Sequence, residues 1–455
     1  PQTLIPFLDE TGRFHLEPVE TIYATQEISK IRIATIIGSE AAYVTPKALV
    51  RHSPGLKPLY WLRLRGNRRV LTTGDHSVFC PGMFPKAVER LRPKDLVVVP
   101  KRLAAPPQLE YIDFLAYCSV NEPGRFFVRN FNRKDLTALV GGWRSRAARK
   151  RGNYSGRGAM PLGLLSKPTD NLRIGLCRQH RTTYMPAHLD ITPDLARWVG
   201  LFIAEGSYGT HTSIFSFGSH EADLIADVLE TGQRIFGIQG RLTIRGSNTS
   251  IRFHSASLKV FLEEFLGISR GARMKRIPWQ VFHFSDETKR AFLYGLTRGD
   301  GHESGTGFVI SSGSRLLLSD VLYLCAMLGM QGNLFRQVRA SQRRIKGVWT
   351  NASDIWGVRF HRWHFLPTGD CVLLPRSSAK GRPLAGTVGV DGDVCAVDVR
   401  TIEAAVECPT YVYDFVVEPD QNFVGGDSPI VLHNSTIEGG MVVTDEPILD
   451  SVLRM

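Results

Sequence analysis

The sequence predicts a multidomain protein in which an all-β module is split by an inserted α+β domain of two pseudo-symmetric repeats. Three observations lead to this fold class. The chain has 455 residues, which is too long for one hydrophobic core. Stretches near both ends alternate polar with β-branched or aromatic residues, which is typical of half-buried strands. The segment between them contains two near-copies of one short motif, which indicates a duplicated unit.

The β module is predicted by residues 20–100 and 385–432. Short runs such as Tyr60–Leu64 in the first stretch, and closely spaced valines in the second, are separated by Gly, Pro and Asp. Because both stretches share this pattern, the economical arrangement is one β domain with the α+β domain inserted in a loop. We place the two parts of the β domain at residues 1–105 and 385–434.

Each copy of the duplicated motif contains one acidic residue. Residues Gly200–Gly206 and Gly295–Gly301 both begin and end with glycine, and each carries an acid five positions after the first glycine. The acids are Glu205 and Asp300. Two carboxylates on matched elements suggest a metal site between the halves of the repeat, because divalent cations such as Mg²⁺ prefer oxygen ligands.

Capping residues predict a helix before each acid. Thr192 with Pro193 suits the start of the first helix, and Ser285 suits the start of the second. Gly206 and Gly301 are expected to end these helices in the left-handed conformation. Further elements expected in the first copy are a strand from Ser213 to Phe217, a helix from His220 to Phe236, and strands from Arg241 to Arg245 and from Ser250 to His254.

The duplication continues downstream, where Gly237–Gly240 recurs as Gly329–Gly332. On these residues the segment resembles the LAGLIDADG family of homing endonucleases, with a domain at 191–370 and repeats at 191–270 and 284–370. The resemblance implies that Glu205 and Asp300 bind Mg²⁺ and that the protein cuts both strands of a DNA site, which would lie in the uninterrupted host gene around the insertion point. An alternative is a DNA-binding protein of the same fold that does not cut.

Two lysines are candidates for the same centre. Lys275 lies in Met274–Pro278, which matches the Lys-x-Ile-Pro that the family often carries near its active site. A cation there can stabilise charge that develops on a phosphate. Lys346 is the nearest candidate for a partner in the second repeat.

The charge of the chain fits a DNA partner. The net charge is +13, and Lys and Arg gather in two clusters, which would neutralise phosphates. We interpret residues 106–190 as a basic linker or a DNA-recognition region, with a helix-like stretch from Leu109 to Val120. The clusters consist of Arg144, Arg146, Arg149, Lys150, Arg151, Arg157, Lys167, Arg173, Arg178 and Arg181, and of Arg336, Arg339, Arg343, Arg344 and Lys346.

A second set of motifs lies in the β stretches. Thr73 and His76 form a Thr-x-x-His, Asp414 lies in a Tyr-Asp-Phe, and His433-Asn434-Ser435 follows. In this order they resemble an intein, a self-excising segment with the Hint fold, here carrying a DOD-type endonuclease. The resemblance implies protein splicing, with host exteins as partners and residues 435–455 as the host segment.

The residue types suit that chemistry. The Asn434 side-chain amide can attack its own backbone carbonyl, and this intramolecular attack gains greatly from proximity. His433 would polarise that carbonyl or protonate the leaving amine, and Ser435 would accept the upstream acyl group. Thr73 and His76 would serve the upstream junction, with Asp414 assisting.

Two departures from the family pattern stand out. The chain opens with Pro1 instead of a nucleophile, which we interpret as an intein start that lacks its first three residues, and Gln421 stands where a histidine is common. An intein that retains only Asn434 cleavage is therefore an alternative to full splicing. A hedgehog-type Hint domain is a further alternative, which the terminal His433-Asn434 disfavours.

Other classes of protein are less compatible with the sequence. The seven cysteines are scattered without a Cys-x-x-Cys pair, which argues against a disulfide framework and a zinc finger. No apolar run is long enough for a membrane span. We expect a cytoplasmic monomer that needs no cofactor for splicing.

Overall fold

The structure is a computed structural model, in which two compact units can be described separately. Unit 1 comprises Pro1–Pro107, Leu318–His361 and Arg376–Met455, and unit 2 comprises Gln108–Leu317 and Arg362–Pro375. The structure describes residues 1–434 except 122, 131–157, 166–167, 170, 177–181, 305–306, 338–341, 346–347, 352–354, 362, 366–372, 376–386, 390–391 and 407–408. Most of the first basic cluster, Lys346 and Ser435 therefore lie outside the described residues.

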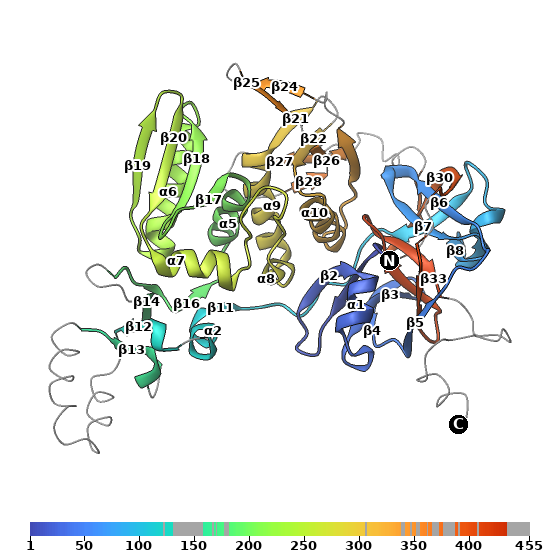
Figure 1. The fold of residues 1–455 in the computed structure, drawn as a ribbon, viewed down its shortest axis with the longest axis horizontal. Helices are drawn as coiled ribbons and strands as arrows, with labels where there is room; N and C mark the ends of the chain where they lie inside the picture. Colours follow the sequence, from blue (N-terminus) through green and yellow to red (C-terminus); the bar gives the residue numbers. More distant parts are fainter. Residues whose placement is uncertain are drawn as a thin grey trace. The chain divides into compact units, whose positions relative to one another are not determined.

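Unit 1 contains the predicted β module, built from several small sheets (Figure 1). Their strand orders are β2-β1-β3-β4, β10-β30-β6-β7 with β29 beside β30, β31-β5 and β32-β33-β8-β9. The strands are β1 Leu4–Leu8, β2 Phe14–Pro18, β3 Arg32–Ile37, β4 Glu40–Val44, β5 Ala48–His52, β6 Leu59–Leu64, β7 Arg69–Thr73, β8 Ser77–Cys80, β9 Phe84–Ala87, β10 Leu96–Pro100, β29 Thr387–Gly389, β30 Val394–Ala404, β31 Val412–Val416, β32 Asn422–Gly425 and β33 Ile430–His433. The helix α1, Val19–Thr25, follows β2.

Strands from the two ends of the sequence pair with each other. β30 lies between β10 and β6, β31 pairs with β5, and β33 pairs with β8. Their alternate residues form one apolar core, in which Ile33, Leu62, Val97, Val397 and Phe415 are buried. Burial of apolar surface in this shared core stabilises the pairing of segments that are far apart in sequence.

Unit 1 also holds most of the second expected repeat. The boundary between the units falls within α10, Arg315–Met327. β23, Asn333–Gln337, pairs with β26, Ile355–His361, and β24, Gln342–Ile345, pairs with β25, Val348–Asn351. Gln331 Nε2 donates to the carbonyl oxygens of Pro100 and Lys101 at 3.1 and 3.0 Å, so this repeat is attached to the end of β10.

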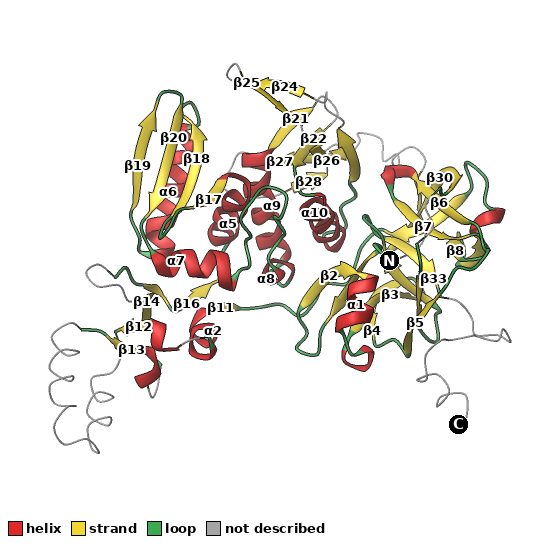
Figure 2. Ribbon diagram, viewed as in Figure 1, coloured by secondary structure: helices red, strands yellow, loops and turns green. Residues whose placement is uncertain are grey.

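Unit 2 is organised around two adjacent helices, α5 (Pro193–Glu205) and α9 (Asp286–Asp300), seen in Figure 2. The expected N-caps are confirmed, because the side chains of Thr192 and Ser285 accept hydrogen bonds from the amides of Leu195 and Thr288. The elements of the first copy also occur as predicted, within one or two residues. They are β18 Ser213–Gly218, α6 Ala222–Phe236, β19 Gly240–Arg245 and β20 Asn248–Phe253. The strand β17, Gly206–Tyr208, was not predicted.

The predicted helix ends are wrong in one respect. Gly206 and Gly301 both have extended backbone, with φ of −82° and −108°, and are not left-handed. Each glycine instead begins a strand directly after its acid. A Cβ at Gly206 would collide with the carbonyl oxygen of Phe202, and a Cβ at Gly301 would collide with that of Thr297. The glycines are needed for space, because the chain leaves the helix without a turn.

The residues before α5 form an additional module of unit 2. Part of the helix-like stretch is helical, as α2 (Phe114–Val120), but Tyr111–Asp113 is a strand, β11, paired with β16 (His188–Asp190). A four-stranded sheet has the order β13-β12-β14-β15. Its strands are β12 Phe126–Arg129, β13 Met160–Pro161, β14 Arg173–Leu176 and β15 Met185–Pro186.

The remaining elements of unit 2 are short. They are α7 Ala256–Val260, the π-helical turn η6 Phe261–Phe265, α8 Trp279–Phe282, and the strand pairs β21 Gly301–Ser304 with β22 Gly307–Ser312 and β27 Trp363–Phe365 with β28 Leu373–Pro375. Within the described part of the chain, no helix has the length and apolar character of a membrane span.

Candidate functional site

The helices α5 and α9 approach each other closely through glycines. A Cβ at Gly200 would collide with the backbone carbonyl oxygen of Phe292, and a Cβ at Gly295 would collide with that of Arg197. Each helix therefore contributes one glycine that lets the backbone of the other helix touch it. Because both helices end at their acids, this contact brings Glu205 and Asp300 to the same end of the pair.

The two carboxyl groups share one desolvated environment. Gly299 separates them, and a Cβ at this position would lie 3.1 Å from Glu205 Cγ. Burial and then the charge of Asp300 raise the pKa of Glu205 to about 7. Burial raises the pKa of Asp300 to about 6. When no cation is present, the charged form of both acids is therefore disfavoured, as expected for acids that are buried near a like charge.

Lys275 is placed beside these acids. Its ammonium group donates a hydrogen bond of 2.7 Å to the carbonyl oxygen of Ala204, the residue before Glu205. The charge of Lys275 opposes the rise in the pKa of both Glu205 and Asp300. Ser314 Oγ donates to the carbonyl oxygen of Lys275 at 2.8 Å and so fixes its backbone. The two acids of the duplicated motif and the lysine of the Lys-x-Ile-Pro match are therefore brought together.

The residues of this acid pair fit a divalent cation. Two carboxylates whose pKa values are raised by burial would gain from a cation that offsets their charge. Hard carboxylate oxygens suit Mg²⁺ or Ca²⁺. No cluster of three or more His, Cys, Asp or Glu side chains able to hold a metal occurs among the described residues.

A basic sheet face begins immediately after Glu205. β17 is an edge strand of the sheet β17-β18-β20-β19, and Phe215 and Phe253 of this sheet are buried against Trp198 of α5. The residues at alternate positions form the opposite face, called here the open face. They are Ile214, Ser216 and Gly218 of β18, Asn248, Ser250 and Arg252 of β20, and Arg241, Thr243 and Arg245 of β19.

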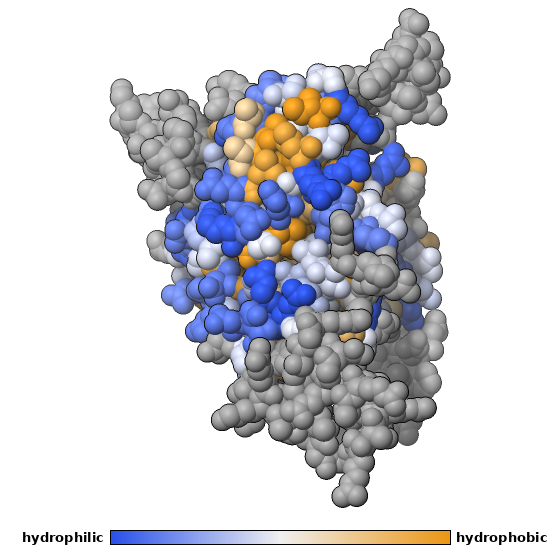
Figure 3. All heavy atoms as spheres, turned by 90° about the vertical axis from the view of Figure 1, so that its left-hand side faces the viewer, coloured by the Kyte–Doolittle hydropathy of each residue, from blue (hydrophilic) through white to orange (hydrophobic). Residues whose placement is uncertain are grey.

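The open face carries three exposed arginines, and its strands contain no acid. Such an imbalance of charge is the footprint of a surface that contacts phosphates. Figure 3 shows one side of the molecule, where hydrophilic residues surround a band of hydrophobic ones. On the same sheet, β19 also exposes Leu242 and Ile244, at 45% and 62%.

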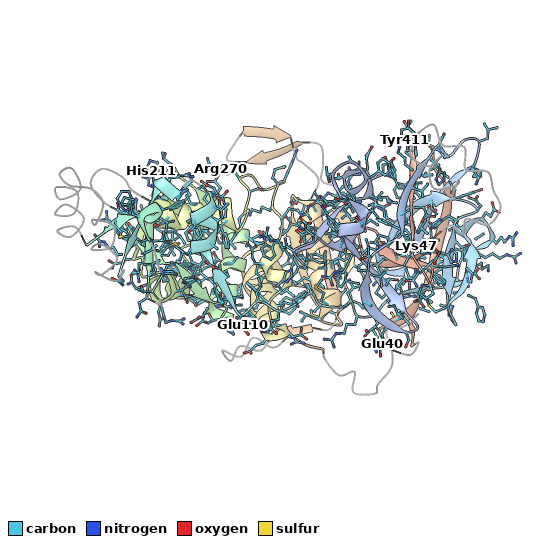
Figure 4. The ribbon with its side chains drawn as sticks, turned by 90° about the horizontal axis from the view of Figure 1, so that it is seen from below. Glu40, Lys47, Glu110, His211, Arg270 and Tyr411 are labelled. Atoms are coloured by element: carbon cyan, nitrogen blue, oxygen red, sulfur yellow. The ribbon has the colours of Figure 1, made fainter. Side chains whose placement is uncertain are left out.

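Arg270 adds a further cation near the strand that follows Glu205. It is labelled in Figure 4 and lies over the ring of Tyr208, 5.8 Å from the centroid, while it pairs with Glu263. The Tyr208 hydroxyl donates to the carbonyl oxygen of Ile268 at 2.9 Å. These contacts hold the end of β17 in place.

A second site in unit 1 surrounds Asn434. This residue follows β33 and is 3% exposed. Its backbone amide donates to the carbonyl oxygen of Gln421, and its Nδ2 donates to that of Val417, each at 3.0 Å. Within the described residues, Asn434 Oδ1 has no hydrogen-bond partner. The hydrogen bond from Nδ2 to Val417 therefore fixes the orientation of the side-chain amide.

His433 interacts with the backbone of Asn434. Burial lowers the pKa of His433, a hydrogen bond with the Asn434 backbone raises it, and His76 and Asp414 have smaller opposing effects. An interaction that raises the pKa of an imidazole favours its protonated form. Phe79 packs against the imidazole, with 5.1 Å between ring centroids.

The Thr-x-x-His motif forms a turn between β7 and β8. The amide of His76 donates to the carbonyl oxygen of Thr73 at 3.2 Å, and the side chain of Thr73 bonds to Asp75. β8 pairs with β33, which brings the turn near His433. Asp414 lies on β31 and is buried, with 6% of its surface exposed.

Sequence reasoning missed His52. This half-buried residue ends β5. Burial lowers the pKa of His52, and the charges of Asp414, Lys57, Asp75 and His76 have smaller effects. Nothing in the local sequence marks His52, because its neighbours are brought together by pairing between β5 and β31. Ser435 and Lys346, the other predicted site residues, lie outside the described part of the chain.

Comparison with protein families decides the assignment of unit 1. A family model described as "Intein splicing domain" matches residues 15–434, which is most of the chain. The chain belongs to the intein splicing-domain family. The resemblance inferred from Thr73, His76 and His433-Asn434 is thereby confirmed. In this intein, the match ends at Asn434, the residue that we predicted as the last of the splicing domain.

The curated relatives of this intein are longer proteins. The chain is 26% identical over 308 residues to "Replication factor C small subunit" of Methanocaldococcus jannaschii. This match covers 55% of the chain and 16% of that protein. It is 22% identical over 494 residues to "DNA polymerase" of Thermococcus kodakarensis, which covers 86% of the chain and 28% of that protein. The chain thus spans less than a third of either relative.

Solved structures resemble parts of the intein. I-DmoI in complex with DNA and Ca is 13% identical, with a TM-score of 0.26, over 37% of this chain and 83% of that chain. The transcription factor IIB Mvu mini-intein is 19% identical, with a TM-score of 0.20, over 22% of this chain and 68% of that chain. Neither likeness is close enough to define the fold of either unit.

Proposed function

We propose that this intein cleaves the peptide bond after Asn434 by cyclisation of the asparagine side chain. The supporting observation is that Asn434 is buried, with its Nδ2 held by the carbonyl oxygen of Val417 and the His433 imidazole next to it in the chain. A hydrogen bond from that imidazole to the Asn434 carbonyl oxygen would make the carbon that the side chain attacks more electrophilic and would stabilise the oxygen as negative charge develops on it.

The proposed step is balanced within the chain. Asn434 Nδ2 forms a bond to its own carbonyl carbon and loses a proton, and the bond from that carbon to the Ser435 nitrogen breaks. His433 delivers a proton to the departing amine and takes up the proton that Nδ2 loses, so its protonation is unchanged at the end of the step. The bond from Nδ2 to the Val417 oxygen holds the amide in one orientation and so limits the entropy lost at the transition state.

In a chain that continues upstream, the same centre would complete protein splicing. Ser435 would first accept the upstream acyl group, so that Asn434 cyclisation releases the joined host segments. Thr73 and His76 would act at the upstream junction and Asp414 would assist, as the family resemblance implies. Full splicing and cleavage at Asn434 alone differ in whether the host segments become joined.

Intact-mass measurement tests the cleavage step. The purified chain, incubated in mild conditions, should lose residues 435–455, and Asn434→Ala should not. Asn121→Ala is the matched control, because Asn121 is also an asparagine whose Nδ2 donates to a backbone carbonyl, that of Tyr117 at 3.0 Å. If the wild-type chain keeps its full mass, the cleavage proposal is wrong.

We propose a second activity for unit 2, cleavage of double-stranded DNA at the acid pair, as in a LAGLIDADG homing endonuclease inserted in the splicing domain. The supporting observation is that close contact between α5 and α9 brings Glu205 and Asp300 together with Lys275 beside them. A bound Mg²⁺ would activate water and stabilise the leaving oxygen. Glu205 and Asp300 would hold it, and Lys275 would stabilise charge on the phosphate.

The open face would position the duplex. Its arginines Arg241, Arg245 and Arg252 can neutralise phosphates, so binding should weaken as salt rises. The target is expected to be the DNA formed when the host coding sequences on either side of the intein are joined. The solved I-DmoI structure is a complex with DNA and Ca, and a duplex and a divalent cation are the ligands that we propose for this intein.

Cutting and binding must be separated in the test. Glu205→Gln and Asp300→Asn should abolish magnesium-dependent cutting of that DNA while mobility-shift binding persists. A protein of the same fold that only binds DNA would show no cutting in the wild type. Unchanged cutting by either variant would refute the assignment of the acids.

A further inference from the structure

The pairing of β5 with β31 places His52 on the same face as the Asp414 carboxylate. β5 and β31 are antiparallel, with Asp414 opposite Val50 and Val412 opposite His52. Residues directly opposite each other lie on the same side of a sheet, and so do residues two positions apart on one strand. His52 and Asp414 therefore lie on one face as diagonal neighbours, a spacing of roughly 7–8 Å that long side chains can bridge.

The contacts of the other face support this arrangement. Leu49 and Phe415 are opposite each other and are buried in the core of the β module. Arg51 follows on the same side, with its guanidinium 4.4 Å from the ring centroid of Tyr411 and 4.9 Å from that of Tyr23. Tyr411 is labelled in Figure 4. The core and this aromatic cluster occupy one face, so His52 and Asp414 occupy the other.

Some charged groups affect both His52 and His433. His52 is affected by Asp414 of β31, by Lys57 of the loop before β6, and by Asp75 and His76 of the turn after β7. His433 is affected by His76 and Asp414. Asp414 and His76 are therefore common to both imidazoles, and Lys57 is neutralised by Asp75 at 2.6 Å.

We propose that His52 is a positioning residue of the splicing centre, which acts on His433 through the charge of Asp414, its neighbour on the same face of the β5–β31 pair. A proton on His52 draws the carboxylate towards β5 and adds positive charge to the centre. His433 then holds its own proton less firmly. Because we propose that His433 polarises the carbonyl of Asn434, His52 adjusts how strongly that carbonyl is polarised. This role rests on the proposed cleavage at Asn434.

Histidine titration by NMR tests the coupling without depending on cleavage. The full chain, with Asn434→Ala to prevent cleavage and isotope-labelled histidine, is titrated from about pH 5 to about pH 8, the range in which imidazoles titrate. His52→Lys places a permanent charge at this position and should lower the pKa of His433 by about 0.5 units. His52→Gln removes the charge and should raise it.

If His52 acts through its charge, the pKa of His433 should be highest in His52→Gln and lowest in His52→Lys, with the wild-type value between them. A merely structural role would leave both variants unshifted or move them in the same direction, and either result would overturn the proposal. His15→Gln and His15→Lys are the matched controls, because His15 is a half-buried histidine 3.0 Å from Asp9. They should leave His433 unchanged.

Cleavage rates provide the second readout. In chains that retain Asn434, His52→Lys should slow the release of residues 435–455 near neutral pH relative to His52→Gln, and folding is checked by the other histidine resonances. If the wild type does not cleave, the proposed function fails, while the titration still decides whether His52 acts on His433. If cleavage occurs and the titration shows no ordered shift, only the inference about His52 fails.

Discussion

Lys275 donates a hydrogen bond of 2.7 Å to the carbonyl oxygen of Ala204, so a cation from the loop before α8 is fixed at the end of α5. The C-terminal carbonyls of a helix lack partners within the helix and carry partial negative charge. The bond satisfies one such carbonyl and places the ammonium group next to Glu205. Lys275 therefore has both a structural partner and a position beside the acid pair.

Replacing Lys275 with Met should lower the rate of DNA cleavage by about 100-fold, comparable to the loss of one donor that stabilises transition-state charge. DNA affinity should change little. Single-turnover cleavage and mobility shifts measure the two quantities. Lys259→Met is the matched control, because Lys259 also donates to a loop carbonyl, that of Thr210 at 3.1 Å, but is not beside the acids. Equal rates for both variants would contradict the role of Lys275.

Replacing Gly200 or Gly295 with Ala should destabilise the protein by about 1–3 kcal/mol, as for overpacked cores. The reason is that the added Cβ would collide with the backbone of the facing helix. Urea unfolding measures the loss of stability. Gly124→Ala is the control, since a Cβ at Gly124 meets nothing within 4 Å. If Gly200→Ala is as stable as Gly124→Ala, the helices are not in backbone contact.

Without a divalent cation, the stability of the fold should fall as pH rises from about 4 to about 7. The pKa of Glu205 is raised from 4.5 to about 7 and that of Asp300 from 3.8 to about 6, so the folded chain binds more protons than the unfolded chain in this range. The stabilising protonated forms are fully present below the unfolded pKa values and are lost as pH rises through the folded ones.

Thermal unfolding at several pH values, with and without Mg²⁺ or Ca²⁺, measures this dependence. Glu205→Gln should stabilise the cation-free protein at pH 8 by about 1 kcal/mol, a figure discounted because the group is partly exposed. Added cation should raise the melting temperature of the wild type and have less effect on this variant. A wild-type melting temperature that is insensitive to both pH and cation would contradict a shared acid site.

Local features of the fold were predictable from the sequence. Thr192 and Ser285 mark helix starts because a capping side chain acts within three residues. Glu205 and Asp300 could be paired because the duplicated motif places each at the same offset. The end conformations of Gly206 and Gly301 could not be predicted, because glycine is compatible with both a left-handed cap and the tight extended exit that occurs here.

The environment of the splicing residues depended on long-range pairing. His433 and Asn434 were recognisable as a motif. The bonds from Asn434 to Gln421 and Val417 were not predictable, because they depend on where β32 and β31 lie relative to β33 in the fold. His52 was not recognisable at all, since its relation to Asp414 follows from the register of strands that are separated by most of the chain.

The mass of the C-terminal peptide in the product that ends at Asn434 tests the central claim most directly. If Asn434 cyclises, a digest of freshly cleaved protein should contain a peptide that ends at residue 434 and is lighter by one water than the same peptide with a free carboxylic acid. Asn434→Ala should yield no such peptide. A product that from the earliest time ends only in the free acid, or a residue 434 that stays joined to Ser435, would contradict the account.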